Sequence, residues 1–393
     1  MNRELISGDP GKVLVSYTIP LFASVIFQQL YSIADSVIAG KFAGEDALAA
    51  IGAGYPVTMI FMAVAIGCQI GCSVVISRLF GAGDIKGTKT SISTAVIAGS
   101  VLSFLLMLVG VIFSAELMEL VNTPENIFEQ GNLYLKIYTG GFVFLFLYNV
   151  ITGIFNSLGD SKTPLFMLIG SSVGNILLDA LFVIKFGWGA AGTAWATFIA
   201  QGAACIFSAA VLYHRVRDMK TSEAAPKFSF GALMDISSVA VPSILQQSFI
   251  SVGNMVIQYL VNGFGSSVIA GYSAAIKLNT FAVTGFTTLG NGISGFTAQN
   301  LGAEKPERVR KGFRYGLIFA LAAAGVFFLA FFFFGRTLLS LFMNNESSRL
   351  AEDTGVMFLR IVSPFYFVVC TKLACDGVLR GAEKMGYFIL SPV

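Results

Sequence analysis

Ten long apolar runs dominate this sequence and leave most charged residues grouped between them. They cover approximately residues 13–39, 48–77, 90–114, 133–158, 163–184, 189–213, 236–261, 268–300, 314–335 and 354–380. Each run is long enough to cross a bilayer as a helix, which takes about 20 apolar residues. Charged residues make up only 12% of the chain, against roughly 25% in soluble proteins. The sequence therefore predicts an all-α polytopic membrane protein with ten complete spanning helices in a lipid bilayer, and it gives no indication of nucleic-acid binding.

The basic residues outside the apolar centres are distributed unevenly between the two sides of the membrane. With the N-terminus in the cytoplasm, seventeen of them lie on the cytoplasmic side, and only Lys41, Lys185, Arg336 and Arg349 lie outside. An excess of lysine and arginine in cytoplasmic loops is the usual pattern in membrane proteins. We therefore expect a multi-pass protein of the cell membrane with a cytoplasmic N-terminus.

The two halves of the chain resemble each other at a shift of 221 residues. The segment SRLFGAGD at 77–84, for example, parallels AQNLGAEK at 298–305. Repeats with an even number of helices enter the membrane in the same sense and are related by an axis along its normal. We expect an N-terminal lobe at 1–213 with helices one to six, a cytoplasmic linker at 214–235 and a C-terminal lobe at 236–393.

The second half is shorter than the first. A complete copy of the N-terminal lobe would end near residue 434 (213 plus 221), whereas the sequence ends at Val393. The nine residues that follow Lys384 cannot cross a bilayer. The C-terminal lobe is therefore expected to be incomplete, with helices seven to ten and the start of an eleventh, as in a truncated product of a twelve-helix protein.

An aspartate inside the first apolar run needs a reason, because an ionised carboxylate at mid-bilayer costs about 2.5–3.5 kcal/mol on insertion scales. Asp35 follows Gln28, Tyr31 and Ser32 by seven, four and three residues. At helical spacing these residues form one polar stripe. Such a stripe is expected to face protein or water and not lipid.

The fifth and sixth runs carry a similar arrangement. Asp179 on the fifth run has Asn175 one helical turn before it, and Thr197 and Gln201 have the same spacing on the sixth. Carboxylate, amide and hydroxyl groups suit either of two tasks. A carboxyl group in a cavity of low dielectric binds and releases a proton more readily near neutral pH, and the oxygen atoms could also bind Na⁺.

The polar residues of the second half are mostly neutral. Gln247, Asn254 and Gln258 follow one stripe on the seventh run, and Lys277 lies on the eighth. We expect them to line the other wall of a substrate cavity. Asp376 and Lys372 are one turn apart on the tenth run, and we interpret them as a structural ion pair.

Several segments in order resemble the multidrug and toxic compound extrusion (MATE) family. They are PLFASVIFQQLYSIADSVIAGKFAGEDALAAIG in the first run and its loop, SRLFGAGD after the second, GIFNSLGDSKTP after the fourth, GNILLDALFV with GWGAAGTAWAT around the fifth and sixth, and GVLRG at Gly377. The resemblance extends along the whole chain. It implies twelve helices in two lobes and export of organic, often cationic, compounds in exchange for H⁺ or Na⁺.

The resemblance also assigns residues to sites. It implies that Asp35, Asn175, Asp179 and Thr197 form a cation-coupling site in the N-terminal lobe, which would take H⁺ or Na⁺. The predicted protein is a secondary antiporter, active as a monomer on small organic compounds, that needs no cofactor beyond the coupling ion. An enzyme is not indicated, because no histidine lies in a span and no serine–histidine arrangement or paired aspartate motif of an intramembrane protease is present.

Three alternatives stay open on the sequence. Lys277, with Lys136, Arg360 and Lys372 near or within spans, would suit a flippase or exporter of an anionic or lipid-linked substrate in the same superfamily. A lobe short of two helices could instead leave a remnant that does not transport. Asp35 and Asp179 could also serve only as hydrogen-bonding partners between helices, because polar residues hold membrane helices together.

Overall fold

The computed structural model describes residues 4–43, 45–221, 224–340 and 349–390, and within these ranges it holds helices and no strand. The first half contains α1 (Pro10–Ile38), α2 (Glu45–Ala82), α3 (Ile85–Ile112), α4 (Ser114–Leu120), α5 (Glu125–Gly140), α6 (Phe142–Ser157), α7 (Lys162–Asp179) and α8 (Gly189–Arg217). The second half contains α9 (Phe230–Asn262), α10 (Ser266–Gly302), α11 (Pro306–Leu339), α12 (Arg349–Val362), α13 (Tyr366–Gly381) and α14 (Met385–Leu390).

Four short helical turns complete this list. They are the 3₁₀ turns η1 (Glu4–Ile6) and η4 (Ser363–Phe365) and the π-helical segments η2 (Ala39–Ala43) and η3 (Ala180–Lys185). The two π segments follow directly after α1 and α7, the helices that carry Asp35 and Asp179.

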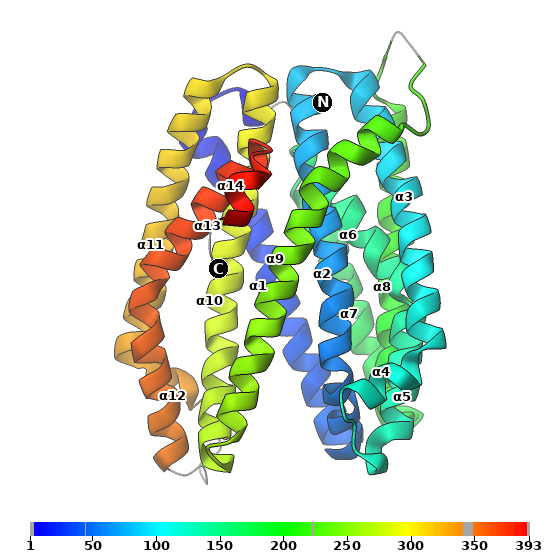
Figure 1. The fold of residues 1–393 in the computed structure, drawn as a ribbon, viewed down its shortest axis with the longest axis vertical. Helices are drawn as coiled ribbons and strands as arrows, with labels where there is room; N and C mark the ends of the chain where they lie inside the picture. Colours follow the sequence, from blue (N-terminus) through cyan, green and yellow to red (C-terminus); the bar gives the residue numbers. More distant parts are fainter. Residues whose placement is uncertain (1–3, 44, 222–223, 341–348, 391–393) are drawn as a thin grey trace.

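Each of the ten predicted runs falls on one helix or on one pair of consecutive helices, so the all-α membrane fold is confirmed. Among the described residues, seven helices are long and apolar enough to span a membrane, and an eighth span is formed if the bent pair α5 and α6 is counted as one. The long helices α9 and α10 also run along the bundle (Figure 1).

Two predicted spans are interrupted. The run 133–158 bends by 44° between α5 and α6, at Gly141. The run 354–380 consists of α12, η4 and α13, with Pro364 near the start of η4. Proline lacks the backbone N–H that would continue an α-helix, so it favours a change of helical geometry at this place.

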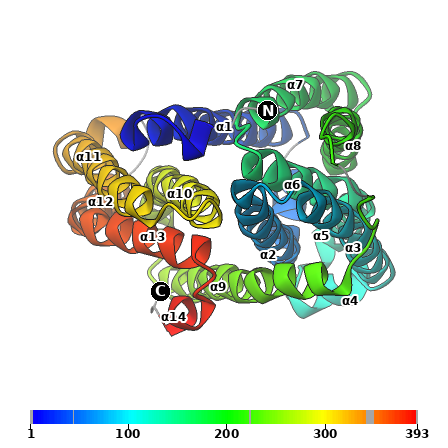
Figure 2. The same ribbon diagram turned by 90° about the horizontal axis from the view of Figure 1, so that it is seen from above.

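The helices lie side by side as two groups that meet in the centre (Figure 1). Seen from above, α2 and α10 occupy the middle, and α1 and α9 lie on opposite sides of them (Figure 2). The first half of α1 packs on the second-half helices α10 and α11, where Tyr17 and Thr18 lie against Gly295 and Gly292. Its end packs on α7. In the same way α9, a second-half helix, packs mainly on α2.

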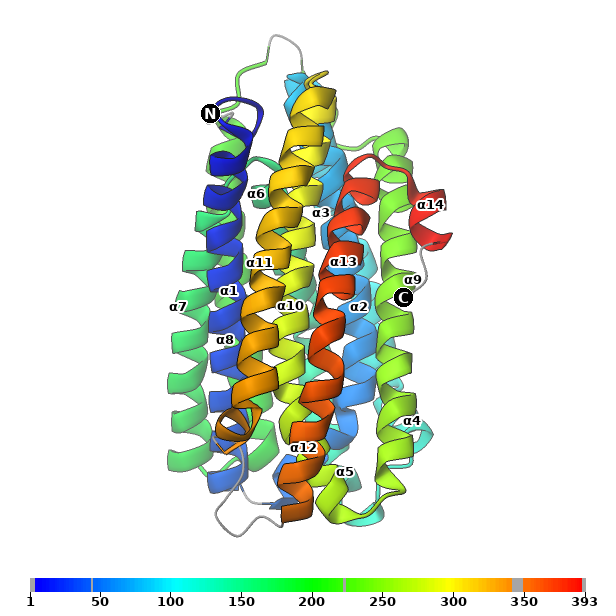
Figure 3. The same ribbon diagram turned by 90° about the vertical axis from the view of Figure 1, so that its left-hand side faces the viewer.

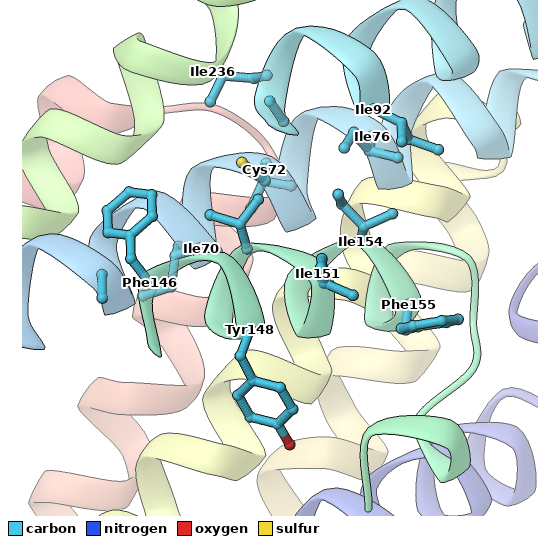
Figure 4. Packing of buried hydrophobic residues seen from close by; sticks show 14 of the residues in the cluster. Ile70, Cys72, Ile76, Ile92, Phe146, Tyr148, Ile151, Ile154, Phe155 and Ile236 are labelled. Carbon is cyan, nitrogen blue, oxygen red and sulfur yellow. The ribbon is translucent and has the colours of Figure 1, made fainter. Parts of the chain in front are cut away.

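Large apolar side chains hold the first-half helices together. Ile70, Cys72 and Ile76 of α2 pack among Ile151 and Ile154 of α6 (Figure 4). Phe146, Phe155, Ile92 and Ile236 belong to the same cluster, which therefore joins α2, α3, α6 and the beginning of α9. A second cluster joins α10, α11, α12 and α13 around Phe286, Phe331 and Tyr366.

Four helices end in the same tight turn at the end of the bundle where α1 begins, which we call the amino end. Gly83, Gly159, Glu304 and Glu383 have φ of 78°, 79°, 56° and 56°. In each turn the next N–H donates to the carbonyl oxygen five residues earlier, at 2.8 to 3.1 Å. This is the Schellman arrangement of a helix C-terminus. The turns after α2 and α10 are the two segments that the sequence repeat aligns (Figure 3).

Candidate functional site

Three helices bring the predicted coupling residues together. Asp35 lies near the end of α1, Asn175 and Asp179 lie on the last turn of α7, and Thr197 lies on α8. α7 packs on both α1 and α8 (Figure 2). Asn175 is only 2% exposed and Asp179 is fully buried. Asp35 and Thr197 are half-buried. The four residues therefore form one polar group, buried on α7, between helices that are separate in the sequence.

The backbone changes geometry beside both carboxyl groups. Asp179 is the last residue of α7 before the π segment η3, and Asp35 precedes the π segment η2 by one turn. The two π segments contact each other. A π segment is rare and often marks a functional site.

The carboxyl groups of Asp35 and Asp179 lie within hydrogen-bonding reach of each other. A carboxyl group can donate only when it is protonated, so a hydrogen bond between the two would need a shared proton. The second oxygen of each group, Oδ1, is buried and has no hydrogen-bonding partner in the described structure. Two like charges at this distance would repel strongly in a site shielded from water. The pair is therefore arranged to hold a proton or another cation.

The amide of Asn175 connects Asp179 to α8. In the orientation that satisfies both of its polar atoms, its nitrogen donates to Asp179 Oδ2 at 3.2 Å and its oxygen accepts from the Thr197 backbone N–H at 3.2 Å. The opposite orientation leaves one contact of 3.5 Å, from the amide nitrogen to the Thr197 hydroxyl. We take the first orientation, because it pairs donors with acceptors. The amide then presents N–H groups, and not its oxygen, to the carboxylate.

A small cavity lies beside this group. Its walls are formed by Tyr31, Leu168, Ser171, Ser172, Asn175, Thr197, Ala200 and Gln201. A second hollow shares Thr197 and Gln201 with it and extends to Tyr138 and Phe198. Of the residues proposed for the substrate cavity, Tyr31 and Gln201 therefore lie at the coupling group. Among the residues that the structure describes, none forms a hydrogen bond with the buried side-chain oxygen of Gln201.

Two tyrosines of α5 also reach this place, and the sequence prediction did not include them. Tyr134 lies near Asp35, Asp179 and Tyr31. Its ring stacks on Tyr138, with 6.1 Å between the ring centres. The two tyrosines are four residues apart and so share one helix face. That spacing was the available signal, but it does not reveal which helix the face meets.

The remaining predicted cavity residues are not gathered at the coupling group. Gln28 and Ser32 are exposed on α1. Asn254 is exposed and Gln247 and Gln258 are half-buried on α9, and Lys277 is exposed on α10. None of these six lines either hollow. The structure thus places five of them along α1 and α9, which flank the centre, and Lys277 on the central helix α10.

The second half has a buried charged cluster of a different kind. Lys372 Nζ lies 2.6 Å from Asp376 Oδ2, so the predicted ion pair on α13 is present. Gln246 of α9 donates to the same oxygen at 3.2 Å. Arg380, one turn further along, is 2% exposed and stacks over Phe388. One carboxylate beside two cations leaves this cluster with a net positive charge, unlike the acidic pair of the first half.

Both the sequence and the fold of this chain resemble those of known proteins. The family model MatE matches residues 20–181 and 242–389. The probable multidrug resistance protein YpnP of Bacillus subtilis is 28% identical over 383 residues, which cover 97% of this chain and 85% of that protein. The FAD transporter of Shewanella oneidensis is 26% identical over 342 residues, covering 86% and 75%.

Solved structures show the same arrangement of helices. A MOP superfamily transporter from Pyrococcus furiosus superposes with a TM-score of 0.91 at 23% identity. The alignment covers 98% of this chain and 86% of that one. At this level of identity the likeness describes the fold.

Proposed function

Because this chain belongs to the MatE family, whose members are transporters, we propose that it exports amphipathic organic cations in exchange for protons. The family indicated by the sequence motifs is confirmed by the family model. The observation that carries the proposal is the buried carboxyl pair of Asp35 and Asp179.

The charge of the carboxyl pair couples the movement of the proton to that of the organic cation. With a shared proton it carries one negative charge, and without that proton it carries two. The second negative charge strengthens the attraction of this site for an organic cation, and protonation weakens it. Proton and substrate therefore compete for the same charge, which is the requirement for exchange.

The geometry around Asp179 favours a proton over sodium. Sodium is a hard cation and needs several oxygen ligands, in the manner of other such ions. Asn175 presents its N–H groups to Asp179 in the orientation described above, so its oxygen is directed away from the carboxylate. A sodium site at Asp35, Asn175, Asp179 and Thr197 would need the amide to turn over. We therefore propose H⁺ as the coupling ion and keep Na⁺ as the alternative.

The proposed topology follows from the loops. The amino end, which holds the basic segment 305–314, is proposed to face the cytoplasm. We propose lobes at 1–213 and 236–393 joined by 214–235, in a monomer of the cell membrane. Gln28, Ser32, Gln247, Asn254 and Gln258 are proposed to contact the substrate as it moves between the lobes, because they lie on α1 and α9, the helices that pack across both groups.

An exporter of anions is the second candidate function. Lys277 is exposed on α10, and one relative is named as a transporter of FAD, which carries phosphate charges. In this case Lys277 would attract the substrate, and the acidic pair would serve only the coupling ion.

The test uses purified protein in proteoliposomes with a pH gradient and a cationic dye. Asp35→Asn and Asp179→Asn should each reduce gradient-driven dye movement to that of protein-free vesicles, because the amide keeps the shape but cannot exchange a proton. Asp235→Asn is the matched control, because Asp235 is exposed at the start of α9. A sodium gradient at equal pH should drive no movement. Dye movement at the parent rate in both aspartate variants would refute the coupling assignment.

A further inference from the structure

The ends of α2 and α10 cross at the amino end with their backbones in direct contact. Gly81 of α2 lies against the carbonyl group of Gln299 in α10. Gly302 of α10 lies in turn against the carbonyl group of Arg78 in α2. The repeat shift of 221 converts residue 78 into 299 and residue 81 into 302. The contact is therefore reciprocal, and each half contributes the same two positions.

Only glycine fits at these two positions. A Cβ atom on Gly81 would overlap the Gln299 carbonyl oxygen, and one on Gly302 would overlap the Arg78 carbonyl oxygen. In both cases the obstacle is backbone, which cannot move aside as the end of a flexible side chain can. Small residues let two membrane helices approach this closely, and the Cα–H groups then face carbonyl oxygens, a weak attractive contact.

Two polar links flank the glycine contact, and both join the first half to the second. Arg78 forms an ion pair with Glu383 in the turn after α13. Gln299, which occupies the equivalent position in α10, donates from Nε2 to the carbonyl oxygen of Ser157 at the end of α6 at 2.6 Å. Each central helix is thus tied to the far half by the residue three positions before its glycine.

The same side of α2 continues the contact between the halves. Gly71 and Gly67 lie against Ala240 and Ile244 of α9. Further from the amino end this packing stops, because α9 is exposed from residue 252 to 260 except for the half-buried Gln258. Contact between α2 and α9 is therefore concentrated toward the amino end.

We propose that Gly81 and Gly302 form a clasp that closes the amino end of the transporter and separates once in each transport cycle. This inference rests on the proposed transport function, because an exchanger must open alternately to each side. The clasp is suited to separation. Its members are backbone groups and polar side chains, whose mutual contacts can be replaced by water when the ends part.

The clasp makes a sharp prediction about populations. Gly81 and Gly302 touch only across the two halves in the closed arrangement, so a methyl group there penalises that arrangement and leaves the separated one unaffected. A change that acts on one state shifts the equilibrium toward the other. Gly81→Ala and Gly302→Ala should therefore open the amino end.

The experiment measures the distance between two spin labels by pulsed electron resonance. The labels are attached through Lys162→Cys on α7 and Arg310→Cys on α11, in a background without the five native cysteines. Both sites are exposed at the amino end and lie in different halves. Gly81→Ala and Gly302→Ala should shift the distribution to longer distances, with at least a tenfold change in the ratio of open to closed molecules. Gly325→Ala is the matched control, because a Cβ at Gly325 in α11 meets no atom within 4 Å.

A second set of variants works without a steric change. Reversing one charge, by Arg78→Glu or Glu383→Arg, should lengthen the label distance, and combining both changes should restore the parent distribution. These side chains are 53% and 26% exposed, so the protein tolerates the exchange. If an alanine variant fails to fold, the two charge-reversal variants still test whether the clasp holds the amino end closed. Parent distances in both single reversals would then overturn the clasp, as would parent distances in two folded alanine variants.

These experiments distinguish a failure of the proposed transport function from a failure of the proposed clasp. If the glycine variants lengthen the distance while no tested cation is exported by the parent, the clasp stands and the proposed function is wrong. If the parent exports the dye while both glycine variants keep parent distances, the function stands and the clasp is refuted.

Discussion

The carboxyl groups of Asp35 in α1 and Asp179 in α7 lie within hydrogen-bonding reach of each other. A proton shared by the two groups would join the helix ends by a hydrogen bond. Loss of that proton would remove the bond and add a repulsion between two carboxylates. Protonation of the proposed coupling site would therefore be linked to the packing of α1 on α7.

Replacement of Asn175 tests whether its amide helps to hold the carboxyl groups of Asp35 and Asp179 in place. Asn175→Leu keeps the size of the side chain but removes both the donor to Asp179 and the acceptor for the Thr197 N–H. An unpaired buried polar group costs about 1–3 kcal/mol, so exchange should slow by roughly tenfold or more. The measurement is the rate of gradient-driven dye movement in proteoliposomes.

Ser171→Ala is the control for this variant. Ser171 lines the same cavity, but its hydroxyl donates to the Leu168 carbonyl of its own helix, at 3.0 Å. It should transport at the parent rate. Equal rates for Asn175→Leu and Ser171→Ala would mean that the amide does not support the pair.

The charge of the substrate separates the two candidate functions. Paired cationic and anionic fluorophores of similar size should be exported with a preference for the cation, and Lys277→Gln should leave the cation rate within about twofold of the parent, since Lys277 lies outside both hollows. Such a small change in rate corresponds to less than about 1 kcal/mol. Export of the anion that depends on Lys277 would instead establish the second function.

The charged cluster of the second half should contribute to stability. Asp376 is 1% exposed, forms an ion pair with Lys372 and lies near the buried Arg380. Asp376→Asn leaves buried positive charge and should lower the free energy of unfolding by about 3 kcal/mol. Asp353→Asn removes an exposed partner of Arg336 and should cost less than about 1 kcal/mol. Thermal unfolding of the purified protein compares the two, and similar midpoints would contradict this role.

The tight turns at the amino end allow a test in which two substitutions should change the stability of the protein in opposite directions. Gly83 and Glu304 occupy equivalent left-handed positions after α2 and α10. A side chain in this conformation costs about 1 kcal/mol, so Gly83→Ala should destabilise the protein and Glu304→Gly should stabilise it by amounts of this order. Changes of the same sign in chemical unfolding would show that the turn geometry does not control stability here.

Local properties of the chain account for what the sequence predicted. Each apolar run became a helix or a helix pair because a backbone in lipid must satisfy its own hydrogen bonds. The spacing of Asn175 and Asp179 placed both on one face of α7, since residues four apart are neighbours on a helix. That α1, α7 and α8 would meet came from the family resemblance and not from the spacing.

Contacts between helices account for what the sequence left open. Tyr134 and Tyr138 gave a helix face but not its neighbour, so their place beside the carboxyl groups appeared only in the structure. The bend at Gly141 likewise lies inside one apolar run and leaves its hydropathy unchanged.

Gly81 and Gly302 illustrate the difference between what the sequence determines and what the tertiary structure determines. The sequence by itself determined the spans, the polar stripes and the repeat that makes these glycines equivalent. The spans and the stripes depend on residues close together in the chain, and the repeat follows from a comparison of the two halves of the sequence. Only the tertiary structure decided that Gly81 meets Gln299 and that Asp35 meets Asp179. A glycine has no side chain whose chemistry could indicate its contact. A carboxyl group inside the membrane indicates that it needs a polar or charged partner, but it does not show which residue that partner is. The packing of α1, α2, α7 and α10 supplied both partners.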